Sequence, residues 1–347
     1  MKKKMMMMAA LGAVLLTACE PVESEKKTET GALAVMVGQN LETKAVSTTA
    51  QTFESKLNKL RLLVYDASGS LYKDEEVASP FTSHTIPNVK AGTYSVCAVA
   101  NTCAAISDVT TLTKLTGTVV KLSDCSTTES TGFAMYAQAD GVSVSGGSSA
   151  TPVSLAVTRF PARVKLMSVK NSLPASLGAL TVENVMLING YSQWTLGASG
   201  NPTGAMNPAG RKSNGAGDII ASASDANEAT YSFKAVPSGD QTLANGSAAK
   251  SYGYYFYSFP NLVQTDVTGA KQTGGKARLV VTASFNGNRY YYPVTIPLLE
   301  RNKCYEVTII VSGAGSDDPN VPVTKGSMSV NITVSDWVAG GDYTETI

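Results

Sequence analysis

The sequence predicts an all-β protein with two β-sandwich domains in tandem. Ser, Thr, Gly, Val and Ala dominate the composition, which favours short strands and turns over helices. Runs of alternating apolar and polar residues, separated by turn signals, recur along the whole chain. At 347 residues and 36.2 kDa the chain is long enough for two ordinary domains. Apolar residues make up 43 % and charged residues 16 %, as expected for a globular chain.

The first half of the chain contains a regular series of predicted strands. The run GALAVMV at 31–37 predicts a strand that is buried on both faces. In KLNKLRLLVYDASGSLYK the alternation of Leu60, Leu62 and Val64 predicts a strand, and DASGS supplies the turn to the next one. Further strands are expected in AGTYSVCAVAN (91–101), GFAMYAQ (132–138) and TPVSLAVTRF (151–160).

One short helix is predicted between these strands. The stretch AAISDVTTLTKLTG (104–117) has Ser107 or Asp108 as its expected N-cap, and Gly117 lies beyond its expected end.

The second half begins at the seam, RFPARVKLMSV (159–169), where Pro161 separates one strand from the next. A long region rich in Gly, Asn, Ser and Ala, 190–230, predicts an elaborated loop. Asn286 and Gly287 are the strongest hairpin signal in the chain. The other expected strands are LTVENVMLI (180–188), ATYSFKAV (229–236), SYGYYFYSF (251–259), KARLVVTASF (276–285) and KCYEVTIIVSG (303–313).

The last predicted strand, SMSVNITVSDW (327–337), has one apolar face. Met328, Val330, Ile332 and Val334 share that face, and only Trp337 and a Gly-rich tail follow the strand. The pattern leaves open whether this face completes the core of its own molecule or that of another.

The N-terminus is typical of a secretory signal. MKKKMMMMAALGAVLLTACE has a basic start and an apolar segment too short to span a bilayer. LTAC resembles the bacterial lipobox, and by that resemblance Cys19 becomes the lipidated first residue of a membrane-tethered protein. The alternative is an ordinary signal peptide that contains a cysteine. Without the three N-terminal lysines, 25 basic residues face 27 acidic ones, a net charge of about −2. No basic run with interleaved aromatic residues occurs, so nucleic acid is not an expected partner.

No set of residues in the sequence predicts catalysis, a metal site or a cofactor. His84, the only histidine, is expected in a loop with no Ser–His–Asp arrangement around it. SDDPN (316–320) lacks the alternating ligands of a calcium loop and is expected to be a solvated turn. Cys97 and Cys304 lie in strand-like runs and are expected to be buried.

Two features leave alternatives open. Cys103 and Cys125 flank a loop-rich stretch and either pair or stay reduced. The tyrosines of YGYYFY (252–257) and RYYY (289–292) either form a sugar-binding surface or pack across neighbouring strands, and packing is favoured.

Taken in order, these features resemble the major fimbrillin family of Bacteroidales (FimA/Mfa-like), the subunits of type V pili. The residues that carry the resemblance are the lipobox, LNKLRLLVYDASGSL, YSVCAVANT, TRFPARVKL, LLERNKCYEVTIIVSGAGSDDPN and MSVNITVSDW. It is strongest from ERNKCYEVTIIVSGAGSDDP through VSDW and weakest over 190–250.

The resemblance implies two transthyretin-like β-sandwich domains and a specific route of assembly. A lipoprotein precursor, held at the outer membrane by lipid such as palmitate on Cys19, is cut by a trypsin-like protease. The cut removes the leader and the first strand, and the vacated groove accepts a strand from another subunit. The matching cut lies between Lys44 and Ala45, where the best-known members have an arginine, so the protease is left open. Arg61 is the poorer candidate because it lies inside a predicted strand.

Mapped onto this chain, the resemblance gives the removable strand and the donor strand. Leu33, Val35 and Val37 belong to the first, and Met328, Val330, Ile332, Val334 and Trp337 to the second. The expected parts are a signal peptide at 1–18, a leader at 19–44, sandwich domains at 45–160 and 161–326, and a donor segment at 327–347.

The predicted function is that of a non-catalytic stalk subunit of a cell-surface fimbria that supports adhesion. The alternative is a surface-anchored or tip lipoprotein that binds a glycan or host ligand through its tyrosines and the 190–230 loop.

Overall fold

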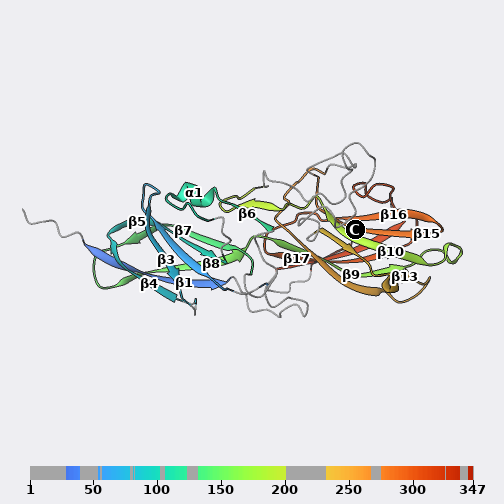
Figure 1. Ribbon diagram of the computed structural model, residues 1–347, viewed down its shortest axis with the longest axis horizontal. Coiled ribbons are helices and arrows are strands. Elements are labelled where there is room, and N and C mark those ends of the chain that lie inside the picture. Colours follow the sequence, from blue (N-terminus) through green and yellow to red (C-terminus); the bar gives the residue numbers. More distant parts are fainter. Residues whose placement is uncertain are drawn as a thin grey trace, which may run out of the picture.

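The computed structural model confirms the all-β prediction (Figure 1). It describes residues 29–39, 54, 57–78, 81, 83–101, 106–122, 132–200, 232–266, 275–324, 326–336 and 343–346. The early strands gather at one end of an elongated molecule and the late strands at the other. Within the described part, no helix is long and apolar enough to cross a membrane.

The N-terminal half is built on one folded-over sheet in the order β3-β2-β5-β7-β8-β1-β4. Its strands are β1 (Thr30–Gln39), β2 (Leu60–Tyr65), β3 (Leu71–Val77), β4 (Ser83–Lys90), β5 (Gly92–Ala100), β7 (Met135–Val144) and β8 (Ala150–Arg159). β7 meets β8 only at Met135 and Tyr136, so the sheet turns a corner there. The layer β4-β1-β8 thus faces the layer β3-β2-β5-β7 across a shared apolar core.

Strands β2 and β5 are apolar on both faces because they separate two cores. Leu60, Leu62 and Val64 face the core shared with β1, whereas Leu63 and Tyr65 face a second core. That second core also takes side chains from α1 (Leu112–Thr116), from β14 (Lys250–Ser258) and from the seam. Since it draws on both halves of the chain, it joins them by apolar packing.

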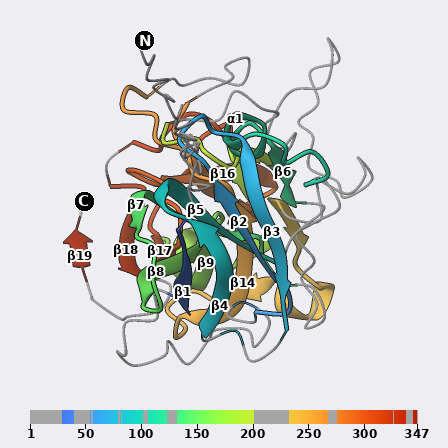
Figure 2. The ribbon, with the colours of Figure 1, turned by 90° about the vertical axis from the view of Figure 1, so that its left-hand side faces the viewer.

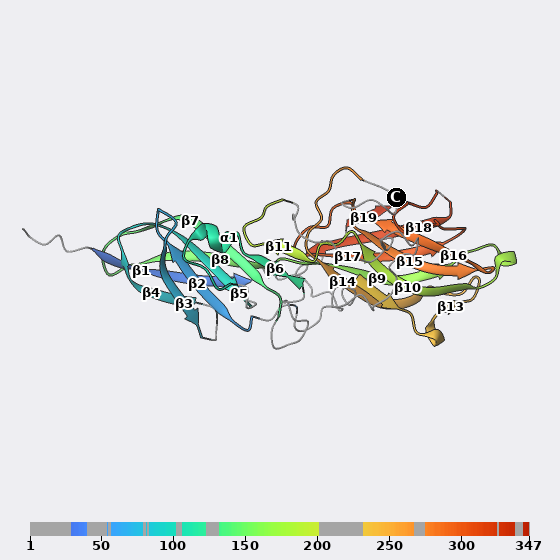
Figure 3. The same cartoon turned by 45° about the horizontal axis from the view of Figure 1, so that its top comes forward.

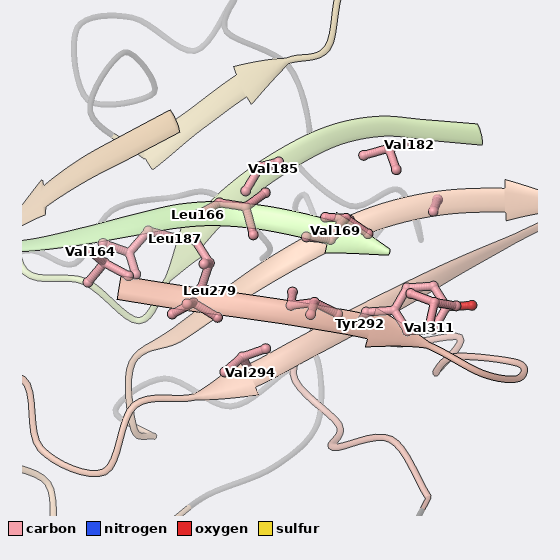
Figure 4. Packing of buried hydrophobic residues seen from close by; sticks show 14 of the residues in the cluster. Val164, Leu166, Val169, Val182, Val185, Leu187, Leu279, Tyr292, Val294 and Val311 are labelled. Carbon is pink, nitrogen blue, oxygen red and sulfur yellow. The ribbon is translucent and has the colours of Figure 1, made fainter. Parts of the chain in front are cut away.

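The C-terminal half is a second sandwich (Figure 3). One sheet has the order β14-β9-β17-β18-β19, with β9 (Ala162–Asn171), β17 (Lys303–Val311), β18 (Met328–Asp336) and β19 (Tyr343–Thr346). The other has the order β12-β10-β15-β16, with β10 (Leu180–Ile188), β12 (Phe233–Ala235), β15 (Arg278–Phe285) and β16 (Asn288–Thr295), and β13 (Thr242–Leu243) also pairs with β10. Val164, Leu187 and Leu279 are among the side chains that fill the space between them (Figure 4).

A small two-stranded sheet also connects the two halves. β6 (Val119–Lys121) pairs with β11 (Gln193–Thr195), and Trp194 of β11 is buried in the second core. Single helical turns also lie at Ala175–Leu177 and Ser238–Asp240.

The hairpin signal corresponds to the structure, whereas the helix signal is shifted along the chain. The Asn286–Gly287 hairpin is confirmed, with both residues at positive φ between β15 and β16. The helix, however, begins at Leu112, so the expected caps Ser107 and Asp108 were wrong. Thr111 is the N-cap, because its side chain accepts a hydrogen bond from the backbone N of Lys114 at 3.2 Å.

Candidate functional site

The first strand lies inside a sheet rather than at its edge. β1 runs antiparallel to β4, with Leu33 opposite Ile86, and parallel to β8, with Val35 opposite Val153 (Figure 2). It is therefore bonded along both sides, and a chain that lost it would expose two rows of unpaired backbone groups. We call the space between β4 and β8 the β1 groove.

Only one face of β1 is buried, so the expectation of burial on both faces was wrong. Leu33, Val35 and Val37 point into the core between the layers, and the first two are fully buried. The alternate residues face outward, and Met36 is 49 % exposed. The groove therefore recognises three inward side chains and tolerates polar residues on the outer face.

One end of the groove admits no side chain. A Cβ on Gly31 would overlap the carbonyl oxygen of Ser145 and lie 3.1 Å from Cγ1 of Val144. The loop after β7 also bonds to this end, because the backbone N of Gly147 donates to the carbonyl oxygen of Thr30 at 3.1 Å. At Gly38, near the other end, a Cβ would meet nothing within 4 Å. The two ends therefore differ in the residue they accept.

Strand β4 forms the outer wall of the groove and terminates the sheet. Its His84 lies in a strand, so the expectation of a loop was wrong, and its Nε2 lies 2.6 Å from Oε2 of Glu75 on β3. Tyr72 of β3 also contacts β4, because its hydroxyl oxygen accepts from the backbone N of Lys90 at 3.1 Å. β1 is the one strand with which β4 pairs in the described sheet. Side chains from β3, together with Ile86 and Val89 in the core, therefore hold β4 if β1 leaves.

The predicted donor strand is docked in its own domain. β18 pairs with β17 over nine residues and with β19 on its other side. Ile332 is 4 % exposed in the C-terminal core, whereas Met328, Val330 and Val334 are only partly buried against it. In this state the apolar face of β18 contributes to its own molecule, and it lies far from β1 (Figure 3).

The segment that leads to β18 is bonded to the C-terminal sandwich at Ser316 and Asn320, and Val323 packs against the C-terminal core. The backbone N and O of Ser316 pair with those of Tyr291 at 2.8 Å each, and the carbonyl oxygen of Asn320 accepts from Nε of Arg278 at 3.4 Å. Within SDDPN, Asp318 accepts from the backbone N of Asn320 at 2.8 Å, as expected for a turn. Asn320 itself is buried, so this part of the turn departs from the predicted solvated turn.

A buried ion pair fixes the chain shortly after β1. Nη1 of Arg163 lies 2.9 Å from both carboxylate oxygens of Glu54, and each residue is 1 % exposed. The hydroxyl of Tyr257 donates to Glu54 at 2.6 Å, and Arg159 donates to its carbonyl oxygen. Burial lowers the pKa of Arg159 to about 10, although the charge of Glu54 opposes this shift. Sequence patterns gave no sign of this cluster, because Glu54 lies in a polar stretch and its partners are over 100 residues away.

The remaining predicted residues divide into three groups. Cys97 and Cys304 are buried free thiols, as predicted, and burial raises the pKa of Cys97 to about 12. Within the tyrosine runs, the rings of Tyr255 and Tyr257 pack edge to face at 5.5 Å and Tyr292 is fully buried, in agreement with the packing interpretation. Outside the described residues lie Cys19, Lys44, Ala45, Cys103, Cys125 and Trp337.

The N-terminal half of this architecture matches a known protein family. Residues 30–166 match the family model of the major fimbrial subunit protein (FimA). Over these residues the chain is similar to that family. The match begins at β1 and ends within β9, so it covers the whole β1 groove. The resemblance to major fimbrillins expected from the sequence is thereby confirmed.

Solved structures of similar fold extend over nearly the whole chain. A putative cell adhesion protein from Bacteroides eggerthii is 20 % identical, with a TM-score of 0.63 over 89 % of this chain and 96 % of that one. A fimbrilin (FimA) from Porphyromonas gingivalis is 13 % identical, with a TM-score of 0.60 over 90 % and 99 %. The tip fimbrial protein Mfa3 of the same species, with a C-terminal truncation, is 12 % identical, with a TM-score of 0.50 over 88 % and 100 %. At these low sequence identities, the similarity shows a shared fold alone.

Proposed function

We propose that the chain is a non-catalytic stalk subunit of a cell-surface fimbria that supports adhesion and polymerises by donor-strand exchange. The observation that carries the proposal is the position of β1, which is bonded on both sides and supplies three core side chains from the start of a FimA-type region. A strand in that position can be cut from its domain, and its loss leaves a groove that only another strand can fill.

The Glu54 anchor supports the proposed position of the cut. Between the end of β1 at Gln39 and Glu54, the only Lys or Arg is Lys44. A trypsin-like protease that cuts between Lys44 and Ala45 frees the leader with β1, while the buried ion pair keeps the following chain on the seam. Arg61 remains a poor site, because it lies in β2 and its Nη2 forms an ion pair with Asp74 at 2.6 Å.

The energetics favour filling the groove. Burial of three aliphatic side chains contributes on the order of 5–9 kcal/mol before association costs. The new strand also restores the hydrogen bonds of β4 and β8. An empty groove is thus a high-energy state that captures a strand from a neighbour.

The proposed donor is β18 of another copy. Its connector is bonded to the sandwich at Asn320, and once the packing of Val323 is released the chain from Asn320 to Gly326 spans at most about 20 Å when extended. Each subunit then offers a groove at its N-terminal end and a strand from its C-terminal half, a head-to-tail contact that builds an open filament.

The precursor belongs to the same proposal. A lipoprotein with lipid on Cys19 is held at the outer membrane until the protease releases it from the leader, and the mature chain joins copies of itself or related subunits. This route acts on the predicted parts of the chain, which are 1–18, 19–44, 45–160, 161–326 and 327–347. The alternative of a glycan-binding tip protein has no comparable support, because the tyrosines that suggested it are half-buried or buried against one another.

Limited trypsin digestion of the purified precursor tests the proposal. Cleavage after Lys44 is expected to produce a ladder of SDS-resistant oligomers, and a Lys44→Ala precursor treated in the same way is expected to stay monomeric. A wild-type protein that is cut after Lys44 yet stays monomeric would contradict the proposal.

A further inference from the structure

We infer that β18 of a second copy enters the β1 groove in the same direction as β1, with Gly326 in the place of Gly31. This inference rests on the proposed strand exchange and adds its polarity and register. The incoming strand would then run parallel to β8 and antiparallel to β4, as β1 does.

The closed end of the groove supplies the first constraint. Any residue other than glycine at the Gly31 position would place its Cβ on the carbonyl oxygen of Ser145. A strand that fills the groove over the length of β1 therefore needs a glycine two residues before its first inward side chain.

The C-terminal segment has a glycine at this spacing. Aligned on the two glycines, GALAVMV (31–37) and GSMSVNI (326–332) share the same pattern. Met328, Val330 and Ile332 take the inward places of Leu33, Val35 and Val37. Ser327, Ser329 and Asn331 then lie on the outer face, where β1 carries half-buried alanines and the exposed Met36.

The opposite direction fails the same constraint. A reversed strand would have to supply Gly340 or Gly341 at the closed end. The first choice places Asp336 in the fully buried position of Val35, and the second places Trp337 there. An unpaired carboxylate costs several kcal/mol in such a site, and an indole overfills a space shaped for valine.

The groove also buries this strand more completely than its own sheet does. In the C-terminal sandwich Met328 and Val330 are only partly buried, whereas the positions of Leu33 and Val35 are fully enclosed. This difference in burial favours transfer of β18 from its own domain to the groove of the next subunit.

Paired cysteines on the exposed face distinguish the two directions. With the inferred register Asn331 takes the place of Met36, opposite Ser83, and Ser329 takes that of Ala34, opposite Thr85. Directly opposed residues in antiparallel strands are close enough for disulfide formation. The variants Asn331→Cys/Ser83→Cys and Ser329→Cys/Thr85→Cys, made without Cys103 and Cys125, are cleaved with trypsin and oxidised.

Ladders of both variants are expected to survive boiling without reductant and to collapse when reductant is added. The swapped variants Asn331→Cys/Thr85→Cys and Ser329→Cys/Ser83→Cys are the matched controls, and they are expected to remain unlinked. Disulfide formation in the swapped variants would overturn the inference but leave strand exchange standing. The same holds if ladders form and none of the cysteine pairs becomes linked. Absence of any ladder before oxidation would instead contradict the proposed function.

A peptide test examines the glycine without altering the fold of the subunit. A peptide of residues 326–336, which contains no Lys or Arg and therefore resists trypsin, is added during cleavage and is expected to cap grooves and shorten the ladder. The Gly326→Val peptide is expected to act on the order of tenfold more weakly, because its side chain meets Ser145, whereas an Asn331→Val peptide is expected to act like the parent. Equal capping by the Gly326→Val peptide would refute the role of the glycine.

Discussion

Leu33→Ala in the uncleaved precursor tests how firmly β1 is held in its groove. Leu33 is fully buried between the two layers, opposite Ile86. Truncation of a buried leucine removes its transfer free energy and leaves a cavity, at a cost of about 2–5 kcal/mol. Because β4 and β8 flank this position on both sides, the backbone has little freedom to close the cavity.

Met36→Ala is the matched control on the same strand. Its side chain is 49 % exposed, so its truncation is expected to change the free energy of unfolding by less than about 1 kcal/mol. Urea denaturation gives this free energy, and hydrogen exchange of the β4 and β8 amides reports the groove itself. Faster exchange in both strands is expected for Leu33→Ala only. Equal effects of the two substitutions would refute the one-sided burial on which the groove rests.

Three further substitutions or conditions test other parts of the structure. Glu54→Gln is expected to destabilise the protein by about 3–5 kcal/mol, because it leaves the buried Arg163 without its charged partner. The control Glu76→Gln, at an exposed position, should change the free energy of unfolding little in the same urea titration. Burial raises the pKa of Cys97 from 9.0 to about 12. The contribution of the buried thiol to the free energy of unfolding is therefore complete below about pH 9 and should be lost as pH rises toward 12. A free energy of unfolding that stays constant over this range would contradict this expectation. Gly287→Ala should cost about 1 kcal/mol or more because φ is 77° there, whereas Gly239→Ala, in open space without positive φ, should be nearly neutral by thermal unfolding.

The strand order along the chain was predictable because alternation and turn residues are local signals. The inward face of β18 and the Asn286–Gly287 hairpin both follow from residues next to one another in the sequence. The burial of β1 was not predictable, because GALAVMV is apolar on both faces and nothing in it shows that Met36 lies at the surface.

Other features depend on neighbours that are distant in the sequence. Pro87 made the surroundings of His84 resemble a loop, yet β4 lies at the end of the sheet, where proline is tolerated. The Glu54 cluster is formed by partners from both halves of the chain. The closed end at Gly31 depends on the backbone of Ser145, which no pattern around Gly31 reveals.

The central claim is that β1 occupies the groove that another copy's β18 fills after cleavage. A mixture of two variants isolates one such exchange. Lys44→Ala keeps its own groove filled but can donate β18, whereas cleaved Val330→Asp has an empty groove and a donor with a charge on its inward face. Val330 is only partly buried in its own sheet, so the second variant is expected to fold.

Size-exclusion chromatography with denaturing gels of this mixture is the most direct measurement. Each variant alone is expected to stay monomeric after trypsin, and the mixture is expected to give an SDS-resistant dimer that grows no further. Long ladders from the mixture, or ladders from cleaved Val330→Asp alone, would show that another segment fills the groove, and a mixture that stays monomeric would contradict strand exchange.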